Sequence, residues 1–118
     1  ATLFFESEEK IDSAKVAYNN KVYSGSIYYA YQSIVNSAKA SLMAEDQKTN
    51  THAGIIANFD TYFITSKKIE LETSFSDLIY QIKNAAHTEE FAKKYIADAN
   101  LFLEKVRTYR NNETSVLK

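Results

Sequence analysis

The two histidines, His52 and His87, are the side chains best suited to transfer protons or bind a metal near neutral pH. A carboxylate-bridged di-iron bundle needs Glu-x-x-His pairs on facing helices. Thr49 and Asn84 stand three positions before the two histidines, so that motif is absent. We predict that both histidines are exposed or locally hydrogen-bonded side chains near helix ends, without a catalytic or metal-binding role.

Cysteine is absent, and the chain has only two glycines, Gly25 and Gly54. Without cysteine there is no disulfide, no zinc thiolate site, no cysteine nucleophile and no cysteine-ligated iron–sulfur cluster. Two glycines cannot build a P-loop or a dinucleotide-binding fingerprint, and no Gly-x-Ser-x-Gly nucleophile elbow occurs. We therefore predict no catalytic residues, no metal site and no cofactor in this domain.

A tyrosine cluster, Tyr28, Tyr29 and Tyr31, has two interpretations. Its rings could stack on bases or line a ligand groove. Alternatively, Tyr28 and Tyr31 pack inward with their hydroxyls at the rim, while Tyr29 faces outward or meets a partner. No basic residue lies between Lys21 and Lys39 to form the basic groove that base stacking needs, which favours a structural or interface role. The candidate interface or ligand groove comprises Tyr28, Tyr29, Tyr31, Lys39, Lys48 and His52.

The composition indicates a single helical domain. The chain has 118 residues, no proline and 45% hydrophobic residues, and a fold with so few turn-forming residues is most simply built from long helices. The net charge of −1 gives no general attraction to nucleic acid or to anionic lipid, so we expect neither as a partner. No apolar run approaches the ~20 residues of a membrane span. The absence of cysteine fits the cytoplasmic location that we predict.

Apolar residues recur with the 3.6-residue period of a helix in five segments. We predict helices at about 3–23, 26–46, 51–63, 74–86 and 88–110, with a break at Ser24-Gly25-Ser26. Thr51 and Thr88 are expected N-caps. A close helix crossing would explain Gly54 inside the third helix. Short loops then predict an all-α, up-and-down bundle of about five antiparallel helices over residues 1–110, with a frayed tail at 111–118.

Three segments of the sequence resemble the HEPN superfamily (higher eukaryotes and prokaryotes nucleotide-binding). They are SIYYAYQSIVNSAKASLMAED, NTHAGIIANFDTYF and LIYQIKNAAHTEEFAKKYIADANLFLEKVRTYR. More narrowly, they resemble the HEPN-like extension at the C-terminus of some bacterial siroheme-dependent nitrite/sulfite reductases. The resemblance covers about residues 11–110, and it implies a bundle of four or five helices that is often dimeric.

The RNase members of this superfamily carry an Arg followed, after four to six residues, by a His. Arg107 and Arg110 are the only arginines here, and no histidine follows either of them. The group expected to transfer protons is therefore missing, and we predict no RNase activity. If the chain belongs to a reductase, its lack of cysteine also places the redox chemistry elsewhere.

These observations predict a noncatalytic accessory or interaction domain that serves assembly or partner docking. The expected partner is a second copy, giving a homodimer, or the catalytic modules of a longer nitrite/sulfite reductase-type protein. The chain opens on Ala1 rather than on methionine, which suggests a fragment of such a protein. The alternative is a nucleotide- or small-ligand-binding HEPN domain. A degenerate RNase or toxin-like enzyme is a third hypothesis, which the missing histidine disfavours.

Overall fold

The structure, a computed structural model, describes residues 4–47, 49 and 51–116. Within them the regular elements are all helical, and no strand occurs, which confirms the predicted all-α class. The elements are α1 (Phe5–Asn19), α2 (Tyr23–Ala44), α3 (His52–Phe59), the π-helical η1 (Asp60–Ile64), α4 (Phe75–Lys83) and α5 (Glu89–Val116).

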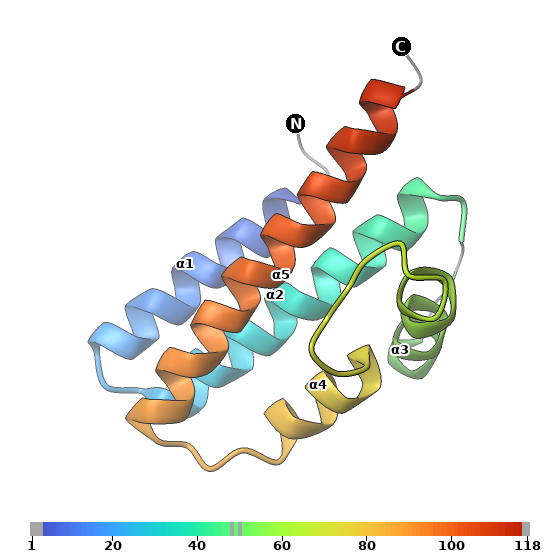
Figure 1. Ribbon diagram of the computed structural model, residues 1–118. Coiled ribbons are helices and arrows are strands. Elements are labelled where there is room, and N and C mark those ends of the chain that lie inside the picture. Colours follow the sequence, from blue (N-terminus) through green and yellow to red (C-terminus); the bar gives the residue numbers. More distant parts are fainter. Residues whose placement is uncertain (1–3, 48, 50, 117–118) are drawn as a thin grey trace.

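Helix α2 lies at the centre of the bundle and contacts α1, α3, α4 and α5 (Figure 1). Figure 1 shows that α1 and α2 run in opposite directions and that α5 lies along both of them, in the same general direction as α2. The 28 residues of α5 make it the longest element. They rise about 42 Å at helical geometry. The molecule measures 45 × 26 × 25 Å, so α5 sets its length. In the described chain, no helix is both long enough and apolar enough to cross a membrane.

The predicted helix break at residues 24–26 is wrong. Helix α1 ends earlier, at Asn19, and Lys21 takes a left-handed backbone conformation with φ of 62°. Two turn hydrogen bonds fix this conformation, Lys21 N to Tyr18 O at 3.0 Å and Val22 N to Ala17 O at 2.8 Å. They form the C-terminal motif that usually places glycine at the left-handed position. Here a lysine occupies it, and for that reason the sequence pattern missed the turn.

Gly25 consequently lies inside the first turn of α2, where it permits a close approach. A Cβ atom on Gly25 would stand 3.2 Å from Val22 Cγ1 and 3.7 Å from Ala17 Cβ. Val22 itself lies in the turn and is exposed rather than buried in the apolar stripe of α1. The glycine therefore matters for the contact between the two helices and not for ending a helix.

The predicted caps Thr51 and Thr88 are confirmed. The Thr51 side chain accepts a hydrogen bond from Gly54 N at 2.9 Å, and Thr88 Oγ1 accepts one from Phe91 N at 3.1 Å. A Cβ atom on Gly54 would lie 2.3 Å from Thr49 Oγ1 and 2.9 Å from Thr51 Oγ1. The capping turn, rather than the predicted helix crossing, therefore excludes a side chain at Gly54.

The C-terminal part differs from the predicted frayed tail. Helix α5 continues through Val116, whereas the sequence predicts that it ends near Arg110. Residues 111–116 contain neither proline nor glycine, so their composition has nothing that stops a helix. Residues 117 and 118 lie outside the described part of the chain.

Four buried phenylalanines from α3, η1, α4 and α5 form the centre of the core, and we call them the phenylalanine cluster. The Phe59 ring lies 4.8 Å from that of Phe63, 4.7 Å from that of Phe75 and 5.3 Å from that of Phe102, measured between centroids. These separations are typical of favourable aromatic pairs. The cluster joins the irregular α3–α4 region to α5.

The contact between α1 and α2 is made differently, through four buried serines that we call the serine seam: Ser7, Ser26, Ser33 and Ser37. Ser33 Oγ donates to Ser7 O, and Ser37 Oγ donates to Ser7 Oγ, each at 2.9 Å. Ser26 Oγ donates to Ala14 O, also at 2.9 Å. Each hydroxyl has a partner across the interface, so the small side chains bring the helices together without leaving these hydroxyls unpaired.

Candidate functional site

The residues that the sequence predicts to form one interface or ligand groove lie in two separate places in the structure. A hydrogen bond of 3.1 Å joins Tyr31 Oη and His52 Nδ1, and it ties α2 to the start of α3. Tyr28 is exposed on α2, so the prediction that it packs inward is wrong, and Tyr29 is half-buried rather than facing outward. Lys39, on the same helix, is exposed. Lys48 lies outside the described residues. The structure therefore joins Tyr31 to His52 and sets the ring of Tyr28 5.9 Å from that of Tyr29, but it does not show a groove built from the whole set.

Tyr28 and Lys39 belong to what we call the outer face of α2. It consists of residues that recur at helical spacing: Tyr28, Gln32, Asn36, Lys39 and Met43. Tyr28 is 55% exposed and Met43 is 58% exposed. Phe5 of α1, 54% exposed, adds a third large apolar side chain beside Met43. A hollow of about 510 Å³ lies between the two helices, and its lining includes Glu6, Asn36 and Lys39.

Gln32 gives this face an unmet hydrogen-bond acceptor. Its Nε2 donates to Tyr28 Oη at 2.8 Å, while its Oε1 is buried and has no partner among the described residues. Turning the amide over would only exchange an unpaired oxygen for an unpaired nitrogen. A buried polar atom without a partner destabilises the folded chain, so this position is a feature to explain.

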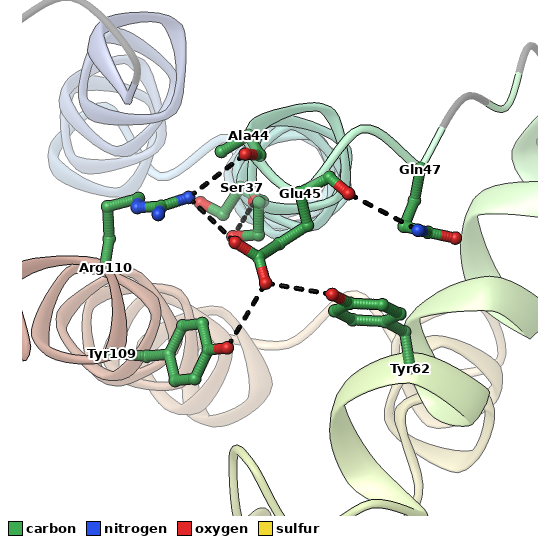
Figure 2. Close-up of polar contacts among 8 residues, drawn as sticks. Ser37, Ala44, Glu45, Gln47, Tyr62, Tyr109 and Arg110 are labelled. Carbon is green, nitrogen blue, oxygen red and sulfur yellow. Dashed lines mark hydrogen bonds and ion pairs between the residues drawn. The ribbon is translucent and has the colours of Figure 1, made fainter. Parts of the chain in front are cut away.

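A second polar centre lies where α2 ends, around Glu45 (Figure 2). Glu45 Oε1 accepts hydrogen bonds from Tyr62 Oη at 3.0 Å and from Tyr109 Oη at 3.3 Å. Glu45 Oε2 pairs with Arg110 Nη1 at 3.1 Å. Figure 2 shows that these side chains come from η1 and α5 and converge on one carboxylate. We call these four residues the Glu45 cluster.

The charges and hydrogen bonds of the Glu45 cluster stabilise the fold by linking three helical elements. Burial raises the pKa of Tyr109 above its usual 10.0, and the negative charges of Glu45 and Glu113 raise it further. The hydroxyl therefore stays protonated and continues to donate to the carboxylate. Because both carboxylate oxygens already have partners, this arrangement holds α2, η1 and α5 together rather than presenting a reactive group.

Sequence reasoning missed Glu45 because it lies in a stretch of polar residues that resembles an ordinary loop. One signal was present: an acidic residue at the C-terminal end of a helix is unfavourable for the helix dipole. Such a residue needs a compensating partner, and Arg110 supplies it. The identity of that partner, 65 positions away along the chain, follows only from the fold.

The remaining candidates of the sequence also have defined places. Arg107 forms an ion pair with Glu8 of α1, so both arginines are paired with carboxylates. His87 is exposed in the segment between α4 and α5. Within the described residues, no three His, Cys, Asp or Glu side chains gather as metal ligands would.

Comparison with known proteins gives the family. The HEPN domain family model matches residues 1–109. The protein named "Putative toxin MJ0605" of Methanocaldococcus jannaschii is 31% identical over 108 residues, which cover 86% of this chain and 81% of that protein. Neither match refers to a reductase. Because the family model matches nearly the whole length of the chain and the described elements form a helical bundle, the chain belongs to the HEPN domain family.

Proposed function

We propose that this HEPN domain is a noncatalytic accessory domain of the cytoplasm, without a cofactor, that docks onto another protein through the outer face of α2. The observation that carries the proposal is exposed apolar surface: Tyr28 and Met43 on that face, and Phe5 on α1 beside Met43, are each more than half exposed. Aromatic side chains and methionine are enriched at protein interfaces.

The partner that we expect is a second copy of the chain. Glu6 and Lys39 line the same hollow, so the surface carries one acid and one base beside its apolar side chains. A two-fold pairing uses the same patch on both copies and can set Glu6 of one copy against Lys39 of the other. Such complementary charges fix the register of an interface more than they add affinity.

The oligomeric state tests this proposal by sedimentation equilibrium. We expect a concentration-dependent dimer, and we expect Met43→Glu to convert it to a monomer by placing a charge in the apolar contact. The matched control is Leu101→Glu on α5, where an equally exposed leucine (51%) lies away from the outer face. A monomer at every concentration, or loss of the dimer in Leu101→Glu alone, would contradict self-association through this face.

The noncatalytic part of the proposal rests on the arginines. Arg107 and Arg110 pair with Glu8 and Glu45, and no histidine follows either of them in the chain. RNA incubated with the purified protein is expected to stay intact. Metal-independent cleavage that disappears in Arg107→Ala would favour an enzyme instead, in line with the toxin name of the archaeal relative.

A second candidate function is the binding of a nucleotide or another small ligand, which the Tyr31–His52 pair favours. Placement of the domain in a nitrite/sulfite reductase-type protein stays a prediction that depends on the sequence resemblance alone.

A further inference from the structure

A groove lies between the middle of α5 and residues 65–74, the segment that joins η1 to α4, and we call it the α5 groove. Figure 1 shows that this segment passes from η1 to α4 as an open stretch of chain. Lys105 Nζ donates a hydrogen bond to Glu70 O at 2.7 Å, which holds the segment against α5. Two hollows of about 450 Å³ and about 140 Å³ form the groove, and both are lined by Leu101 and Lys105. Neither hollow includes a residue of the outer face of α2.

The α5 groove has an apolar floor. Leu101 is 51% exposed although it lies midway along a packed helix. In the smaller hollow the half-buried Leu71 and Leu78 stand beside it, above the buried ring of Phe102. In the larger hollow the buried Ile69 takes this place. The groove therefore offers apolar surface that another apolar side chain could cover.

Unpaired carboxylates surround this floor. Glu70 and Glu104 line the larger hollow and Glu72 lines the smaller one, and all three side chains are exposed. Within the described part of the chain, none of the three has a basic side chain at ion-pairing distance. A positively charged group from outside the molecule can therefore approach each of them without displacing an internal partner.

The lysines of the α5 groove, in contrast, already have contacts inside the molecule. Lys94 Nζ pairs with Asp98 at 3.0 Å, and Lys105 Nζ is held by Glu70 O. Lys68 Nζ stands 3.9 Å from the centroid of the Tyr62 ring, the distance of a cation–π contact. The charge that remains free for a partner in this groove is therefore negative.

The segment that borders the groove also presents backbone groups to a partner. Among the described residues, the backbone N–H groups of residues 70–73 have no hydrogen-bond acceptor. Residues 70, 72 and 73 are exposed, so water satisfies these groups in the isolated protein. An extended ligand can replace that water with its own main-chain carbonyls, and side-chain pockets beside such a row of groups then select its sequence.

We propose that the α5 groove binds an extended, basic peptide segment of a partner protein. Every second side chain of an extended peptide shares a face, so two apolar side chains of one face can occupy the two hollows beside Leu101. The lysines or arginines between them reach back along their apolar stems to Glu70, Glu72 and Glu104. An acidic segment would instead set like charges against each other. This binding is additional to the docking that we propose for the outer face of α2 and does not depend on it.

A peptide titration followed by amide NMR of the labelled protein tests this proposal. The ligand is the acetylated and amidated peptide Lys-Leu-Lys-Leu-Lys, and we expect saturable shifts at residues 69–73 and 98–108 with a dissociation constant below about 1 mM. The matched peptide Glu-Leu-Glu-Leu-Glu carries the same apolar side chains with the opposite charge. It should bind at least about tenfold more weakly, because its carboxylates meet those of the groove.

Variants separate the charged from the apolar part of the groove. The double variant Glu70→Gln/Glu72→Gln should weaken binding of the lysine peptide about fivefold by removing two ion pairs. Leu101→Ala should weaken it by a similar factor through the lost apolar contact. The controls are Glu90→Gln and Val16→Ala, at an exposed acid and an exposed apolar residue that line neither hollow. Both controls should leave the affinity unchanged, and the dispersion of the amide spectrum verifies that every variant folds.

Three results would overturn this proposal: shifts that never saturate, equally tight binding of the glutamate peptide, or equal weakening in the two controls. Shifts that gather on the outer face of α2 instead of the α5 groove would likewise contradict it. Met43→Glu, which should abolish dimerisation, should leave peptide binding unchanged because Met43 lines neither hollow. The peptide groove and the docking face can therefore fail separately.

Discussion

The serine seam and the phenylalanine cluster join the helices of one small bundle by different means. Across the seam, short side chains between α1 and α2 form directional hydrogen bonds, such as Ser33 Oγ to Ser7 O at 2.9 Å. In the cluster, rings such as Phe59 and Phe75 at 4.7 Å remove large apolar areas from water. The seam fixes the register of two helices at short distance, whereas the cluster stabilises the fold by burying large rings at the centre of the core.

This difference predicts unequal responses to substitution. In the cluster, removal of atoms should be costly because it leaves a cavity. In the seam, addition of atoms should be costly because the helices cannot separate without breaking several hydrogen bonds.

The largest effect is expected from Phe59→Ala, because the Phe59 side chain is fully buried among three other rings. The free energy of unfolding should fall by about 3–5 kcal/mol. Urea denaturation followed by circular dichroism measures it, with Phe5→Ala at an exposed phenylalanine as the control. A loss below about 1 kcal/mol would show that the cluster is not the main source of stability.

The next effect is expected from Ser37→Leu in the seam, which should lower the free energy of unfolding by about 1–3 kcal/mol through overpacking. Ser37→Ala removes only the hydrogen bond to Ser7 and should lower it by about 1 kcal/mol. Ser24→Leu, at an exposed serine of the same helix, is the control. If Ser37→Leu lowers the free energy of unfolding no more than Ser37→Ala does, the seam can accommodate a larger side chain and is not tightly packed.

The smallest effect concerns pH and the Glu45 cluster. The raised pKa of Tyr109 means that the folded chain holds this proton more tightly than the unfolded chain, whose tyrosines titrate near 10.0. The contribution of Tyr109 to stability is therefore complete below pH 10 and is lost as the pH rises above it. The urea midpoint of the natural chain should fall between pH about 9 and about 11 by more than that of Tyr109→Phe. The control is Tyr80→Phe, at an exposed tyrosine, whose urea midpoint should fall as much as that of the natural chain. If the midpoint of Tyr109→Phe falls as much as that of the natural chain, Tyr109 is not responsible for the loss of stability.

The sequence predicted the cluster better than the seam for a physical reason. Phe59, Phe63 and Phe102 lie on apolar stripes of helical period, which single-sequence analysis detects. The seam serines are polar by composition, and only the fold shows that their hydroxyls find partners across an interface. The caps Thr51 and Thr88 were predictable because the bonds that define them span three residues.

Long-range pairs limited what the sequence could say about the candidate site. Tyr31 and His52 were both candidates, but their bond spans 21 positions and was not predicted. The outer face of α2 was anticipated only in part, through Tyr28 and Lys39.

Three helical segments end in left-handed turns without a glycine, at Lys21, Asp46 and Lys67, where φ is 62°, 62° and 63°. A side chain in this conformation is disfavoured by roughly 1–2 kcal/mol, although a glycine there would also make the unfolded chain more flexible. The free energy of unfolding could therefore be raised by substitutions at these turns without changing the fold. These turns are starting points for thermostabilisation, and they lie outside the serine seam and the phenylalanine cluster.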